Sequence, residues 1–112
     1  MEQQGESNHM ERRTADYRRD AERLLAMQRV SWGINFPGRA FHESSFCLSL
    51  RAGIEHGDVY VYEDAGAVVG WLWLDRYEAH VVHIRHIQVT QERWGERIAR
   101  KIMEDAIAIA RA

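Results

Sequence analysis

The spacing of apolar residues predicts two helices in the first half of the chain. Between residues 14 and 30, apolar side chains recur every three or four positions, and arginine and aspartate take the opposite face. Thr14 is placed to cap the start of this helix, and the glycines and proline of SWGINFPGR end it. A second, less regular helix is expected in AFHESSFCLSLRAGI, residues 40–54.

The second half of the chain has the pattern of β-strands before it returns to helical spacing. The sequence DVYVYEDAGAVVGWLWLDRY, residues 58–77, predicts a β-hairpin with its turn at Glu63–Gly66. A third strand is expected at about residues 80–89, and residues 98–110 repeat apolar side chains at helical spacing. The predicted fold is therefore α+β, with two N-terminal helices, a three-stranded, mainly antiparallel sheet and a C-terminal helix.

Composition and charge indicate a small globular domain. A chain of 112 residues suits one domain, and 46% hydrophobic with 29% charged residues is typical of a folded, soluble protein. Residues 1–12 are polar and are expected to form a disordered N-terminus, so that the domain covers residues 13–112. The net charge of −2 gives no support to a nucleic-acid or membrane-surface binder.

Several other classes of protein are excluded by what the sequence contains. The single cysteine, Cys47, has apolar neighbours and favours a core position over a nucleophile. The polar N-terminus is not a secretory signal, and the longest apolar run, AVVGWLWL, falls short of the roughly 20 residues that span a bilayer. A cytoplasmic location without membrane contact is expected.

The turn before the last helix carries the candidate chemistry. A helix N-terminus attracts anions because its first N–H groups are unpaired and carry a partial positive charge. Gly95 would let a ligand approach the backbone closely. Six charged residues surround the turn with a positive excess: Arg93, Arg97, Arg100 and Lys101 against Glu92 and Glu96. The pattern fits a phosphate or pyrophosphate ligand, and it equally fits an ordinary charged surface helix that begins at a tight turn.

Three motifs follow one another in this half of the chain. A hairpin strand contains a glycine followed by apolar residues, VGWL at residues 69–72. An apolar strand then ends in a valine, IQV at residues 87–89, and the loop WGERIA at residues 94–99 opens the last helix. In this order the motifs resemble those of the GNAT family of acyl-CoA N-acyltransferases. The resemblance extends from about Thr14 to the C-terminus.

The loop resembles the family's pyrophosphate loop, Arg/Gln-x-x-Gly-x-Gly/Ala, with two departures. Trp94 stands at the Arg/Gln position and Arg97 at the central glycine, whereas Ala99 fits the last position. A bulky side chain thus occurs where the family lets backbone amides wrap a phosphate. Arg97 or Arg93 is expected to hold a phosphate oxygen instead, by a charge-assisted hydrogen bond.

The resemblance implies transfer of an acetyl group from acetyl-CoA to an amine, with coenzyme A as a substrate and no metal. It also implies a set of coenzyme-binding residues in the strand and the loop: Ile87, Gln88, Val89, Trp94, Gly95, Glu96, Arg97, Ile98, Ala99 and Arg100. The strand residues would hold the pantetheine arm through their backbone in β-sheet fashion. Some members carry a glutamate base six residues before the valine, a position that His83 occupies here.

His83 is thus a candidate general base, because histidine exchanges protons near neutral pH. A half-buried histidine on a strand is the alternative interpretation. A metal site at His80, His83 and His86 is not expected, because the period of two in a strand directs His83 away from the other two.

Two functions stay open from the sequence. The chain ends after the helix that follows the loop, so it resembles the N-terminal part of a GNAT domain. The strand at residues 80–89 is expected to leave an open edge, which predicts a homodimer. The first function is an acetyltransferase acting on a small-molecule or peptide amine. The alternative is a non-catalytic, GNAT-like dimerisation or partner-binding module with weak or no coenzyme A binding.

Overall fold

The computed structural model describes residues 10–78 and 81–112 of the chain. Its elements follow one another in this order: β1 (Glu11–Thr14), α1 (Tyr17–Asn35), α2 (Glu43–Glu55), β2 (Val59–Asp64), β3 (Ala67–Glu78), β4 (Val81–Val89), the 3-10 turn η2 (Gln91–Arg93) and α3 (Ile98–Arg111). The strands form one antiparallel sheet in the order β1-β2-β3-β4. The predicted α+β fold with its helices is confirmed, but the sheet has four strands rather than three.

The additional strand, β1, could not be recognised from its sequence. Its four residues, ERRT, are polar and show no apolar alternation, yet they pair antiparallel with β2. Thr14 therefore ends a strand, and Asp16 caps α1 by accepting a hydrogen bond from the amide of Arg19 at 2.9 Å. The disorder expected for residues 1–12 cannot hold for Glu11 and Arg12, which lie in β1; residues 1–9 lie outside the described residues.

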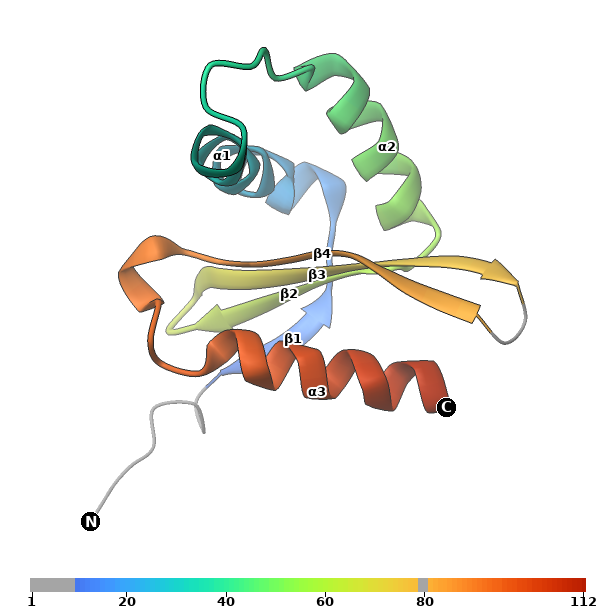
Figure 1. Ribbon diagram of the computed structural model, residues 1–112. Helices are drawn as coiled ribbons and strands as arrows, with labels where there is room; N and C mark the ends of the chain where they lie inside the picture. The colour runs from blue at the N-terminus through green and yellow to red at the C-terminus, as the bar shows by residue number, and fades with distance from the viewer. Residues whose placement is uncertain (1–9, 79–80) are drawn as a thin grey trace.

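Helices cover both faces of the sheet: α1 and α2 lie on one side and α3 on the other (Figure 1). The central strand β3 serves both layers. Trp71 and Trp73 pack with the first two helices, whereas Leu72 and Leu74 pack with α3, and all four side chains are fully buried. Successive strand residues point to opposite faces, so burying both sets requires a helical layer on each side.

Within the described residues, the strand β4 pairs with β3 alone and forms one edge of the sheet (Figure 1). The open edge expected along the third predicted strand is therefore present, and the homodimer stays a prediction. Among the described helices, none is both long and apolar enough to cross a membrane.

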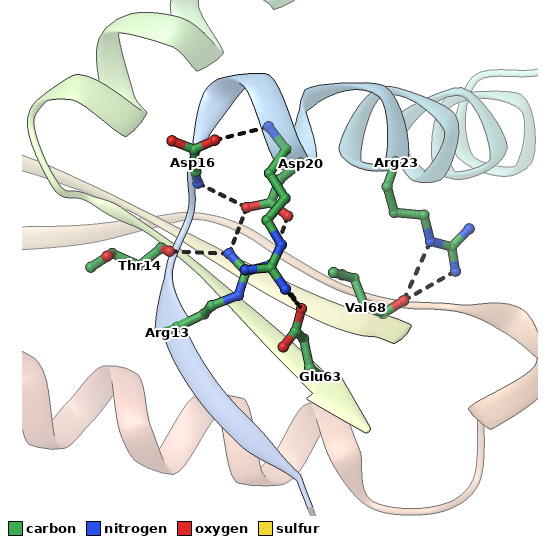
Figure 2. A network of polar contacts seen from close by, with 8 residues as sticks. Arg13, Thr14, Asp16, Asp20, Arg23, Glu63 and Val68 are labelled. Atoms are coloured by element: carbon green, nitrogen blue, oxygen red, sulfur yellow. Dashed lines mark hydrogen bonds and ion pairs between the residues drawn. The ribbon is translucent and has the colours of Figure 1, made fainter. Parts of the chain in front are cut away.

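A partly buried ion pair ties β1 to the first turn of α1 and to the end of β2 (Figure 2). Arg13 donates two hydrogen bonds to Asp20, at 2.7 and 2.8 Å, and one to Glu63 at 2.8 Å. Asp20 is only 2% exposed and also accepts the amide of Asp16 at 2.8 Å. Burial alone raises the pKa of Asp20, but the hydrogen bonds from Arg13 and Asp16 outweigh it and hold the pKa below its usual value.

We expect Asp20→Asn to lower the free energy of unfolding by about 3 kcal/mol, because it leaves the half-buried Arg13 without its main partner. Urea denaturation at neutral pH measures this. Glu104→Gln removes an exposed ion pair with Arg100 and should change stability by less than about 0.5 kcal/mol.

The same carboxylate sets a dependence on pH. The pKa of Asp20 is lowered in the folded protein. The contribution of this carboxylate to stability is therefore complete above the ordinary aspartate pKa of about 4 and is lost as the pH falls through the pKa of the folded state. Wild-type protein should therefore lose more stability on acidification than Asp20→Asn. Equal stability of the two proteins at neutral pH would contradict the role given to this ion pair.

Candidate functional site

The last residues of β4 direct backbone groups toward the open edge. In an antiparallel ladder, hydrogen-bonded and non-hydrogen-bonded pairs alternate. The amide of Thr90 donates to the carbonyl of Val69 on β3 at 2.9 Å, so Gln88, two residues earlier, forms the next hydrogen-bonded pair. The N–H and C=O groups of Ile87 and Val89 therefore point away from β3. These four groups can pair with an extended ligand that carries amides.

A groove of about 420 Å³ runs along this edge, between α1 and the end of β4. Three apolar side chains of its lining remain about half exposed: Val30 and Ile34 from α1, and Trp94 from the turn before α3. The groove continues past η2 to Ala99 in the first turn of α3. It thus joins the free strand edge to a helix N-terminus.

The turn from β4 into α3 is built from two left-handed residues. Gly95 has φ 90° and Arg97 has φ 66°. Glycine adopts this conformation freely, whereas an arginine is strained there. Arg97 occupies the position expected for the central glycine of the pyrophosphate loop, so the chain keeps a backbone path suited to glycine.

Several amides of this turn have no acceptor among the described residues. Arg97 is the N-cap residue of α3 and its side chain makes no capping hydrogen bond. In the part of the chain that the structure describes, the amides of Gly95, Ile98 and Ala99 donate to no protein group. The corner between strand and helix can therefore donate hydrogen bonds to an anion.

The sequence matches a known protein family. The model of the acetyltransferase (GNAT) family matches residues 17–112. The chain belongs to the GNAT family. No curated protein sequence matches it significantly.

Several solved structures share the fold. N-acetylglutamate synthase from Neisseria gonorrhoeae, complexed with coenzyme A and N-acetyl-glutamate, is 18% identical with a TM-score of 0.73; the match covers 91% of this chain and 22% of that one. PaiA N-acetyltransferase from Thermoplasma acidophilum, in complex with coenzyme A, is 17% identical with a TM-score of 0.71 and coverages of 91% and 72%.

A ribosomal-protein-alanine N-acetyltransferase from Brucella melitensis is 21% identical with a TM-score of 0.73 and coverages of 90% and 67%. At these identities the likeness shows the fold alone. This GNAT chain spans only part of each of the three proteins.

The two arginines expected to hold a phosphate, Arg93 and Arg97, differ in their ion pairs. Arg93, whose side chain is 22% exposed, bridges Asp64 at 2.9 Å and Glu96 at 2.7 Å and so fastens the loop to the β2–β3 turn. Arg97 is exposed and takes part in none of the ion pairs of the described residues. Of the two arginines expected to hold a phosphate, Arg97 is thus the one left available. Arg100 lies one turn further along, near Glu104 at 3.6 Å.

The indole of Trp94 contacts the strand edge. Its Nε1 donates a hydrogen bond to the carbonyl of Val89 at 2.7 Å, and its side chain is 57% exposed. Its indole N–H thus bonds to the strand and to no group at the start of α3. Glu96, also in the predicted set, points its carboxylate to Arg93.

The pairing of β3 with β4 contains a register shift, a β-bulge at Arg85, which changes the arrangement of the histidines. His86 lies opposite Trp73 and His83 lies opposite Asp75. Arg85 therefore has no residue of β3 directly opposite it in the strand pairing. Directly opposite residues share a face, and therefore His83 and His86 share one. The expectation that His83 points away from His86 is wrong, because the extra residue resets the alternation.

The exposed His83 is placed six residues before the end of β4, as the GNAT pattern implies. His80 lies outside the described residues. Among those described, no three His, Cys, Asp or Glu side chains are close enough to bind a metal.

Sequence reasoning missed a buried polar chain above β4. The side chain of Gln88 accepts a hydrogen bond from Trp71 Nε1 at 2.9 Å and donates one to Gln28 of α1. His86 stacks on Trp71 and Trp73, with ring centroids 5.4 Å apart in each case. Burial, assisted by the charge of Arg85, lowers the pKa of His86 to about 4. The one signal available was Gln28, a polar residue on the apolar face of its helix.

We expect Arg97→Gly to raise the free energy of unfolding by about 1 kcal/mol, because glycine relieves the left-handed backbone and removes a cation from a helix N-terminus. Gly95→Ala should lower it by a similar amount. Chemical denaturation measures both. Arg100→Gly is the matched control within the helix and should destabilise; stabilisation by that change as well would refute the positional argument.

We expect an NMR titration to give His86 a pKa near 4. Because the folded pKa is lowered, the contribution of this residue to stability is complete above the ordinary histidine pKa of about 6.5 and is lost as the pH falls toward 4. The variant His86→Phe keeps an aromatic ring and cannot titrate. It should lose less stability than the wild type between pH 7.5 and 5, and an equal loss would count against a buried, neutral imidazole.

Proposed function

We propose that this GNAT domain binds acetyl-CoA along the edge of β4 and transfers the acetyl group to an amine. The observation that carries the proposal is the continuity of the site. Outward-facing backbone groups of Ile87 and Val89 lead through an apolar groove to amides at the start of α3 that have no acceptor among the described residues. An extended arm with amides followed by a diphosphate matches this sequence of features.

The two ends of coenzyme A would use different forces. The pantetheine arm would pair with the strand edge through its own amides, as an added strand does. The pyrophosphate would lie at the N-terminus of α3, where the amides of Gly95, Ile98 and Ala99 and the partial charge of the helix favour an anion. The Arg97 guanidinium would add a charge-assisted hydrogen bond.

The reaction joins the amine nitrogen to the thioester carbonyl carbon and breaks the carbon–sulfur bond. The amine must first lose a proton from its ammonium form, and the leaving thiolate must gain one. His83 is our candidate for the base that takes the first proton, because it is exposed on the face of β4 that bears α1 and α2. His86 is less suited to this role, since it is buried in the aromatic stack.

The acceptor is proposed only as a small-molecule or peptide amine. The solved neighbours include a synthase complexed with N-acetyl-glutamate and an enzyme named for ribosomal-protein alanine. These names cover both a small molecule and a polypeptide, so they support no narrower class for this chain.

A second candidate function is a non-catalytic GNAT-like module that forms a homodimer through β4. The observation that favours it is the open edge of this strand, since unpaired N–H and C=O groups readily pair with another chain. In that case the groups of Ile87 and Val89 would serve a second copy rather than coenzyme A. The two candidates differ in their affinity for acetyl-CoA.

We expect calorimetric titration of acetyl-CoA to give a dissociation constant of roughly micromolar size that rises with salt, as a phosphate contact requires. Arg97→Ala should weaken binding about threefold to tenfold, because it removes the free guanidinium. Arg111→Ala, at the far end of α3, should leave it unchanged. Absence of heat at millimolar acetyl-CoA would favour the non-catalytic module.

A further inference from the structure

One of the four outward-facing backbone groups of Ile87 and Val89 already has a hydrogen-bond partner. The carbonyl of Val89 accepts the indole N–H of Trp94 at 2.7 Å. An arm that pairs with β4 in sheet fashion needs this same carbonyl, because Val89 and Ile87 alone direct their groups outward at the end of the strand. In the proposed coenzyme site, the indole of Trp94 thus occupies the place where an amide of the ligand would bind.

We propose that Trp94 is a binding determinant of the coenzyme site, whose indole competes with an amide of the pantetheine arm for the carbonyl of Val89. The proposal rests on the proposed function, since it assigns a competitor to the same site. Coenzyme A binds when the ring leaves the strand edge. The unliganded domain keeps the edge capped.

The geometry makes this exchange feasible. The side chain of Trp94 is 57% exposed and forms no stacking contact with another ring of the described residues, so little buried area holds it in place. Its backbone is fixed separately, by a hydrogen bond from its amide to the carbonyl of Gln91 at 3.1 Å. Rotation of the side chain can therefore release Val89 without moving the loop.

The exchange is expected to affect only the part of the ligand that pairs with the strand edge. The indole lies at the strand edge and lines the groove, whereas the amides proposed for the pyrophosphate lie beyond it, at the start of α3. Displacement of Trp94 is needed for the arm and not for the diphosphate. A ligand without the arm should bind equally well whether or not the indole N–H is present.

The test compares wild-type protein with Trp94→Phe and Trp32→Phe. The first variant keeps an aromatic ring and loses the N–H donor. The second is a matched control, because Trp32 also donates its indole N–H to a backbone carbonyl, that of Arg39 at 3.0 Å, and does not line the groove. Coenzyme A and ADP, which has the diphosphate but lacks the arm, are titrated calorimetrically into each protein.

We expect Trp94→Phe to bind coenzyme A roughly twofold to tenfold more tightly than wild type, the effect of removing one competing neutral hydrogen bond. Trp32→Phe should match wild type, and ADP should bind all three proteins equally. In Trp32→Phe, coenzyme A should also change the emission of the exposed Trp94, and this change should be absent from Trp94→Phe.

The possible failures are distinct. Equal or weaker coenzyme A binding by Trp94→Phe, with measurable binding by wild type, would overturn the role of Trp94 and leave the proposed function intact. A gain of the same size for ADP would overturn it too, because the effect would then not belong to the arm. Absence of coenzyme A binding by all three proteins would overturn both proposals.

Discussion

The ion pair between Arg13 and Asp20 is the constraint on which the rest of the structure depends. A carboxylate that is 2% exposed is costly unless it is paired and hydrogen-bonded, and Arg13 meets both conditions from a different element. The pair thereby fixes the first turn of α1 to β1, and through Glu63 to β2 (Figure 2). Since α1 forms one wall of the groove at β4, the geometry of the candidate site depends on a contact at the opposite edge of the sheet, at β1.

A second constraint places α3. Gly70 lies on β3 beneath this helix, and a Cβ there would lie 3.0 Å from Ile102 Cδ1 and 3.2 Å from the carbonyl oxygen of Gln88. Glycine thus allows the helix to approach the sheet closely. Ile98 and Ile102 use this space and are buried. The N-terminus of α3 is consequently held next to the end of β4. The amides of the turn, which have no acceptor among the described residues, and the outward-facing groups of the strand edge therefore lie along the same groove.

The sequence predicts those elements whose apolar pattern is local. The helix with Ile98, Ile102 and Ala106 and the strand with Trp71 and Trp73 both follow from periodicity. The strand β1 could not be predicted, because ERRT is ordered by pairing with β2 and by an ion pair to α1, both non-local. The bulge at Arg85 could not be predicted either, because no glycine or proline marks its position in the sequence. Nor does any pattern reveal that Trp94 turns back to Val89.

Arg97 connects these observations to function. It combines two local penalties, a left-handed backbone and a positive charge at the positive end of a helix. Within the described residues it forms no ion pair that offsets them, whereas Arg93 is bound on both sides. A strained, exposed and unpaired cation beside free amides is expected where the compensating partner comes from outside the chain. The loop therefore departs from the GNAT pattern in its side chain while it keeps the backbone path, and the departure itself adds positive charge at the point where an anion would bind.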